Sequence, residues 1–257
     1  MASKKKYNED KKGKASLNNR LWNDFRHWVA FNPKQKVMVT ALSAYDQLRF
    51  RKVGKNPRRK KVSHETQLLV EGFRSSANSY LVRCLMQIVE GQDFWYADHH
   101  HSASMAIRAV ELDVPVLLCI RPPLDTCVSS ASRWPIWTVE ESLKHYETFY
   151  TLLLPHLNSV VVTDFLYSIK HPIEVFKYLE EQFDLGLNFE NFSFNAASAY
   201  GRGKTKKEME QDKKADNEKK AILKNDFLAG GDTDLLERCE SLYRRILTEG
   251  EHVLKLD

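Results

Sequence analysis

From residue 67 onward, short apolar runs alternate with segments of helical period, and this alternation limits the possible folds more than any other feature of the sequence. The run Val114–Ile120 is apolar on both faces, which is typical of a strand in the middle of a parallel sheet. Parallel strands need crossover helices between them. The pattern therefore predicts an α/β fold, a three-layer sandwich with a central, mainly parallel sheet. The other strands are expected at Gln67–Glu71, Phe94–Ala97 and Ser159–Thr163, and the helices at Tyr80–Val89, Ala103–Glu111, Thr138–Leu154, Pro172–Phe183 and Leu235–Leu247.

The charged residues are distributed unevenly along the chain. Residues 1–20 are polar, hold seven Lys or Arg against two acids, and are predicted to form a disordered basic tail. The other 237 residues then carry 32 basic and 32 acidic side chains, and at 42% apolar content overall the chain is expected to form a single domain over 21–257. A body with balanced charge argues against a general nucleic-acid-binding domain.

Two segments inside this domain are strongly charged. Arg49–Lys61 has eight basic residues and no acidic one, and it is interpreted as a solvated loop, with a role in holding an anionic ligand or acceptor as the alternative. Residues 201–220 are almost free of apolar side chains and are expected to form either a mobile flap or an exposed helix.

The cysteines and the lack of long apolar runs bear on the cellular compartment. Four cysteines without a C-x-x-C pair indicate reduced thiols, and neither a zinc site nor any other metal site is expected. The N-terminus lacks an apolar signal core, and no window supplies the roughly 18 apolar residues of a membrane span. The sequence therefore predicts a cytoplasmic protein without a membrane span.

A loop of small and hydroxylated residues, Gly72–Ser79, follows the first strand and enters a helix. Such a loop aims main-chain N–H groups and a helix N-terminus at one point, which is typical of an anion site. Arg74 adds a permanent charge, and Ser75, Ser76, Ala77, Asn78 and Ser79 complete the candidate binding loop. The alternative is a plain strand-to-helix turn with an N-capping Ser or Asn.

A second candidate anion site follows the strand Val114–Ile120. The sequence Arg121-Pro122-Pro123-Leu124-Asp125 leaves the strand in extended form, Asp125 suits the cap of a following helix, and Ser129 then lies about one turn into that helix. Ligands of open α/β folds bind at the carboxyl ends of the strands, so Arg121 and Ser129 are expected to meet on one anion there. Two such sites on neighbouring strands suit a ligand with two separate phosphate groups.

These two segments resemble the nucleotide-binding motifs of PAPS-dependent sulfotransferases. Gly72–Ser79 is similar to their 5'-phosphosulfate loop, approximately G-x-P-[RK]-S-G-T-T, with Ser76 in place of Gly and Ala77-Asn78 in place of the Thr pair. Arg121–Ser129 is similar to their 3'-phosphate motif, approximately R-D-P-R-D-x-x-V-S, with Pro122 and Leu124 as departures. The segment Val160–Leu166 resembles a later strand of the family. The resemblance implies a P-loop-like fold and PAPS as sulfuryl donor.

The resemblance also implies roles for other residues. His99 or His100, after the strand Phe94–Ala97, would be the general base that deprotonates the acceptor, although the Lys-x-His pattern of the family is not reproduced. Arg74 would stabilise charge on the departing adenosine bisphosphate. Arg202 and Lys204 stand where the family often has a mobile segment over the 3'-phosphate, and a solvated linker is the alternative.

The expected function is sulfuryl transfer from PAPS to a hydroxyl or amine acceptor that the sequence does not identify. One alternative is a P-loop kinase or other nucleotide triphosphatase, but no Gly-Lys follows Gly72, and Ser198 stands where a motif ending in Gly203-Lys204-Thr205 needs its first glycine. The other alternative is an inactive nucleotide-binding or polyanion-binding protein. Aromatic residues are not interleaved with the basic runs, which argues against nucleic acid as the partner.

Overall fold

A computed structural model describes residues 62–98, 100–134, 137–190, 192–193 and 206–256, with backbone alone over 206–213, and the single positions Leu21, Asp24, Phe25, Trp28 and Val37. The predicted basic tail and the basic segment Arg49–Lys61 lie outside these residues.

The described chain contains one sheet of five parallel strands in the order β2-β1-β3-β4-β5. Leu69 of β1 faces Val116 of β3 and Ala97 of β2 in the register, so β1 and β3 are neighbours at the centre. The mainly parallel sheet predicted from the sequence is confirmed. The strands are β1 Leu68–Gly72, β2 Tyr96–Asp98, β3 Val116–Ile120, β4 Val161–Asp164 and β5 His252–Leu254.

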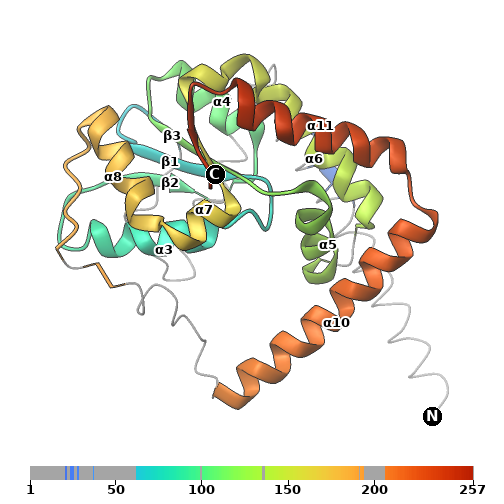
Figure 1. Cartoon of the computed structure of the whole chain (residues 1–257). Coiled ribbons are helices and arrows are strands. Elements are labelled where there is room, and N and C mark those ends of the chain that lie inside the picture. The colour runs from blue at the N-terminus through green and yellow to red at the C-terminus, as the bar shows by residue number, and fades with distance from the viewer. Residues whose placement is uncertain are drawn as a thin grey trace, which may run out of the picture.

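Helices cover both faces of this sheet (Figure 1). Alternate strand residues point to opposite faces. Leu69 and Leu118 pack against the layer that includes α4, α6 and α11, whereas Val70 and Leu117 pack against α3 and α8. The three-layer sandwich is therefore confirmed. The helices are α3 Asn78–Ile88, α4 Ala103–Glu111, α5 Pro123–Arg133, α6 Val139–Leu153, η1 Leu154–Ser159, α7 Phe165–Lys170, α8 Pro172–Phe183, α10 Lys206–Gly230 and α11 Thr233–Glu249.

Two elements, α5 and β5, differ from the sequence-based expectation. The helix after the second motif begins at Pro123 with Pro122 as N-cap, because proline is preorganised for the first helical position. Asp125 therefore lies inside the first turn of α5 and pairs with Lys224 instead of capping the helix. The edge strand β5 was not predicted, because it is only three residues long. Over 206–220 the chain is helical, as part of α10, and side chains 214–220 are mostly exposed, which agrees with the exposed-helix alternative.

No helix within the described ranges is both long and apolar enough to cross a membrane.

Candidate functional site

The β1–α3 loop, residues 73–77, leaves the carboxyl end of a central strand and enters α3 at Asn78. Ser75 and Ala77 both have left-handed backbones, with φ of 65° and 76°. Ser76 between them does not have a positive φ, so the backbone alternates between two conformations. A backbone of this kind turns successive N–H groups toward one side and forms a concavity that can bind an anion. Ala77 is the N-cap of α3 and makes no side-chain cap bond, and within the described chain the amides of Ser75, Ser76, Ala77 and Asn78 donate no hydrogen bond. The donors that the sequence predicted are therefore available at a helix N-terminus.

Gly72 begins this loop because no side chain fits there. A Cβ atom at this position would lie 2.4 Å from the main-chain oxygen of Cys119 and 2.8 Å from Oδ1 of Asn78. The absence of a side chain lets β1 end in close contact with β3 and lets Asn78 reach back, where its Nδ2 donates to the oxygen of Gly72 at 2.9 Å. Asn78 thus fixes the loop instead of capping the helix.

Arg121, at the end of β3, reaches this same loop. Its Nη1 donates to the main-chain oxygen of Ser75 at 3.1 Å, and its Cζ lies 4.1 Å from the ring centroid of Phe165. Burial lowers the pKa of Arg121, although the guanidinium stays charged at neutral pH. The second motif therefore brings a cation to the donors of the first, as expected for neighbouring strand ends.

Arg74 points toward α6. Its side chain is 5% exposed, and its Cζ lies 4.0 Å from the Trp137 centroid and 5.1 Å from the Phe73 centroid. Nη2 lies 3.5 Å from Nδ1 of His145 on α6. Burial lowers the pKa of Arg74 to about 10, while burial and the neighbouring guanidinium lower the pKa of His145 to about 4. A permanent cation is therefore stacked beside a neutral imidazole at the base of the loop.

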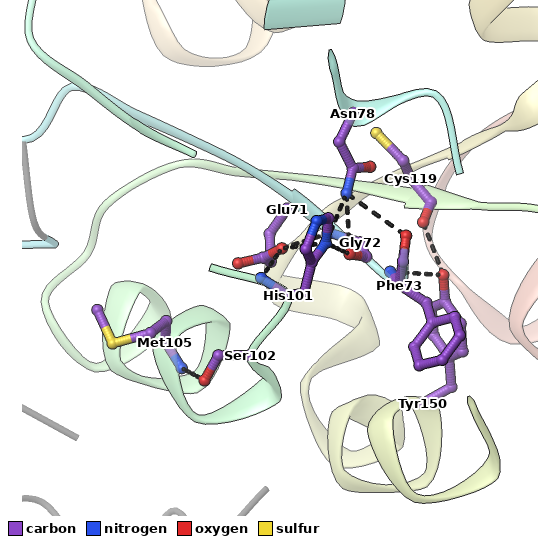
Figure 2. A network of polar contacts seen from close by, with 9 residues as sticks. All are labelled: Glu71, Gly72, Phe73, Asn78, His101, Ser102, Met105, Cys119 and Tyr150. Atoms are coloured by element: carbon purple, nitrogen blue, oxygen red, sulfur yellow. Dashed lines mark hydrogen bonds and ion pairs between the residues drawn. The ribbon is translucent and has the colours of Figure 1, made fainter. Parts of the chain in front are cut away.

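His101 contacts the residues on either side of this loop, Gly72 and Asn78 (Figure 2). Its Nδ1 lies 2.9 Å from the oxygen of Gly72 and 3.3 Å from Nδ2 of Asn78. A carbonyl oxygen only accepts, so the shorter contact, with Gly72, favours the tautomer with the proton on Nδ1 over a bond donated by Asn78. The side chain keeps 25% exposure and the backbone is left-handed, with φ of 50°. Sequence reasoning favoured His99 and His100 over this residue.

Glu71, the fourth residue of β1, is a second group that sequence reasoning missed. Its Oε1 accepts from the amides of Gly72 at 2.9 Å and His101 at 3.0 Å, and the side chain has no exposed surface. Burial is the main reason that its pKa rises to about 8, and the neighbouring Asp98 raises it further. One signal was present in the sequence: Glu71 is an acid placed between the apolar run Leu68–Val70 and Gly72, where a buried strand ends.

Two tyrosines one turn apart on α6 hold the ends of β1 and β3. Tyr150 OH donates to the oxygen of Cys119 at 2.7 Å and accepts from the amide of Phe73 at 3.3 Å (Figure 2). Tyr146 OH donates to the oxygen of Arg121 at 2.9 Å. One helix therefore holds the backbone of both motif segments. The sequence did not indicate these hydrogen bonds, because the partners of the two hydroxyl groups are main-chain atoms.

The remaining predicted residues lie on α5, on α3, before α4 or outside the described chain. Ser129 is on α5 with 2% exposure, and no hydrogen bond joins it to Arg121 in the described structure. Ser79 is in the first turn of α3, and His100 is half-buried before α4. His99, Arg202 and Lys204 lie outside the described residues.

Among the described residues, no group of three or more His, Cys, Asp or Glu is arranged to hold a metal ion. No known protein family, curated protein or solved structure matches the chain.

Proposed function

We propose that the chain is a PAPS-dependent sulfotransferase that transfers a sulfuryl group to a hydroxyl or amine acceptor and releases 3',5'-adenosine bisphosphate. The observation that carries the proposal is the contact between Arg121 and Ser75, which joins the two motif segments at the carboxyl edge of the sheet. The available amides of the β1–α3 loop suit the 5' end of the donor, and Arg121 with Ser129 suits its 3'-phosphate.

The residues of the loop fit an anionic donor in charge as well as in shape. Arg121 brings a permanent cation to the loop, while Arg74 is buried toward α6. Among the described residues, the acid that accepts from the amide of Gly72 is Glu71, whose pKa is raised. Bound PAPS would supply an activated sulfuryl group. The protein's contribution is then to position the donor and to stabilise charge on the leaving phosphate, a role for which the resemblance suggests Arg74.

His101 is the general base that we favour for this reaction. With Nδ1–H donated to the oxygen of Gly72, Nε2 would be the nitrogen that takes the proton of the acceptor. The sequence pointed to the same trio of histidines, and His99 and His100 remain the alternatives. Substitution of the true base is expected to slow transfer by about 10²–10⁴-fold. Transfer rates of His99→Ala, His100→Ala and His101→Ala, measured with labelled donor, therefore separate the three residues.

Calorimetric titration with 3',5'-adenosine bisphosphate, 5'-AMP and ATP tests the nucleotide site. The protein is expected to prefer the bisphosphate, and Arg121→Ala is expected to weaken its binding about tenfold to a hundredfold, since charge-assisted hydrogen bonds contribute about 1.5–3 kcal/mol. Binding of 5'-AMP should change little. Arg245→Ala removes an exposed arginine paired with Glu249 on α11 and serves as the control.

Each other outcome of this titration points to a different protein. A preference for ATP would favour the nucleotide triphosphatase alternative. Binding of the bisphosphate without transfer to any acceptor would indicate an inactive nucleotide-binding protein, and no nucleotide binding would refute the proposal.

A further inference from the structure

We propose that Glu71 is a positioning residue of this site, whose buried carboxyl group, uncharged when the site is competent, ties the start of the β1–α3 loop to the His101 turn. This inference rests on the proposed function, because the anion that the loop would bind is the nucleotide. It concerns the regulation of that site by pH.

The geometry shows what the carboxyl group joins. One oxygen, Oε1, accepts from two amides, that of Gly72 where the loop begins and that of His101 in the turn before α4 (Figure 2). The oxygen of Gly72 in turn accepts from Asn78 and from the ring of His101. Loop, helix start and histidine are therefore connected through two adjacent residues of β1.

The surroundings of Glu71 favour its neutral form. Of the residues that the structure describes, only His101 has a basic nitrogen within 4 Å of the carboxyl group, with Nδ1 at 3.9 Å. The other titratable groups that face it are Asp98 on β2, Cys119 on β3 and Tyr150 on α6, and none of these supplies a positive charge. The main-chain amides that donate to the carboxyl group favour its charged form, but burial outweighs them and the pKa is about 8.

The consequence for ligand binding follows from charge. Below this pKa, Glu71 is neutral, and the loop presents main-chain amides and the nearby Arg121 to an anion. Above it, a buried negative charge lies directly beside the loop and repels the same anion. At an effective dielectric of about 20, repulsion between two unit charges at such short range is expected to weaken binding by about tenfold or more. By reciprocity, nucleotide binding also promotes proton uptake by Glu71 near this pH.

The test is calorimetric titration of the full chain with 3',5'-adenosine bisphosphate from pH 6.5 to 9.5. The affinity of the wild type is expected to fall by about tenfold or more across this range. Glu71→Gln mimics the neutral carboxyl group, since its amide oxygen can accept both main-chain bonds. It is expected to bind with an affinity that changes by no more than about twofold over the same range. Glu71→Ala lacks both bonds and should bind weakly at every pH, so recovery of binding in Glu71→Gln identifies the neutral acceptor as the required feature.

Glu180→Gln provides a matched control, because Glu180 also accepts from two amides, those of Gly186 and Leu187, but lies on α8. It should keep the pH dependence of the wild type. Nucleotide binding at pH 6.5 with the same pH dependence in wild type and Glu71→Gln would overturn this inference and leave the proposed function standing. Absence of binding by the wild type at every pH would overturn both.

A second measurement does not depend on nucleotide. The folded pKa of Glu71 is about 8 and its usual value is 4.5, so the folded state holds the proton more tightly. The free energy of unfolding should then decrease as pH rises from about 4.5 through 8, by about 1.4 kcal/mol for each unit of pKa difference. Glu71→Gln should lack this decrease, as measured by urea unfolding at several pH values. If the free energy of unfolding changed equally with pH in the wild type and in Glu71→Gln, Glu71 would not be neutral in the folded protein.

Discussion

The shape of the β1–α3 loop depends on the backbone conformation of Ser75 and Ala77 more than on their side chains. Ser75 and Ala77 adopt left-handed backbones that L-residues other than glycine avoid, at a cost of about 1–2 kcal/mol each. Two such residues in one loop indicate that the surroundings, including the bond from Arg121 to Ser75, hold the strained form. Where the resembled motif has a glycine, this chain has Ser76, so the left-handed positions do not coincide with the glycine expected from the motif.

Ala77→Gly is therefore expected to stabilise the protein by about 1 kcal/mol, because the strain at φ of 76° disappears and outweighs the greater freedom of glycine in the unfolded chain. The measurement is the free energy of unfolding from urea titration. Ala221→Gly, the same substitution at an exposed position inside α10, should instead destabilise by about 1 kcal/mol. Loss of stability in both variants would show that Ala77 is not strained.

At the scale of elements, α6 connects the two motif segments. Tyr146 and Tyr150 lie one turn apart with ring centroids 4.6 Å apart, and their hydroxyl groups meet main-chain atoms at the ends of β3 and β1. The backbone at Arg121 is thus held by a helix that contributes no charge to the site. Loss of the hydrogen bond from Tyr146 to the oxygen of Arg121 should shift the position of Arg121 and leave its charge unchanged.

Tyr146→Phe removes one hydroxyl group and keeps the ring. We expect a loss of about 1 kcal/mol in stability and a severalfold loss of affinity for 3',5'-adenosine bisphosphate, with little change for 5'-AMP, since Arg121 would serve the 3'-phosphate. Urea unfolding and calorimetry with both nucleotides measure this. Tyr178→Phe, which removes a phenol bond to His252 remote from the motifs, should cost similar stability and no affinity. Equal losses for both nucleotides would mean that Tyr146 acts on the fold alone.

The elements and the site were predictable from the sequence to different degrees. Val116–Ile120 and Ala103–Glu111 could be predicted because strand alternation and helical period follow from local burial. Arg121 and the Gly72 loop could be placed at one sheet edge because parallel strand ends meet there. The roles of Tyr150 and His101 could not, since they depend on contacts with main-chain oxygens of residues distant in sequence, which side-chain patterns do not encode.

At the scale of the whole molecule, α10 leaves the sandwich as a long helix, and its C-terminal half packs on α5 (Figure 1). Polar contacts join Asp216 to Ser132 at 2.8 Å, Lys224 to Asp125 at 3.1 Å and Lys219 to the oxygen of Ser132. Phe227, near the end of α10, is buried in the same apolar core as α5 and α6.

Apolar burial, more than ion pairing, is expected to attach α10. Phe227→Ala should destabilise the protein by about 3 kcal/mol, since truncation of a buried phenylalanine loses its transfer free energy and leaves a cavity. Lys224→Gln breaks a pair whose side chains are both about half exposed and should cost less than about 1 kcal/mol. Urea unfolding measures both losses, and hydrogen exchange of the α10 amides shows whether the helix detaches alone. If Lys224→Gln costs as much as Phe227→Ala, the charged contacts hold α10, and raised salt should then release it.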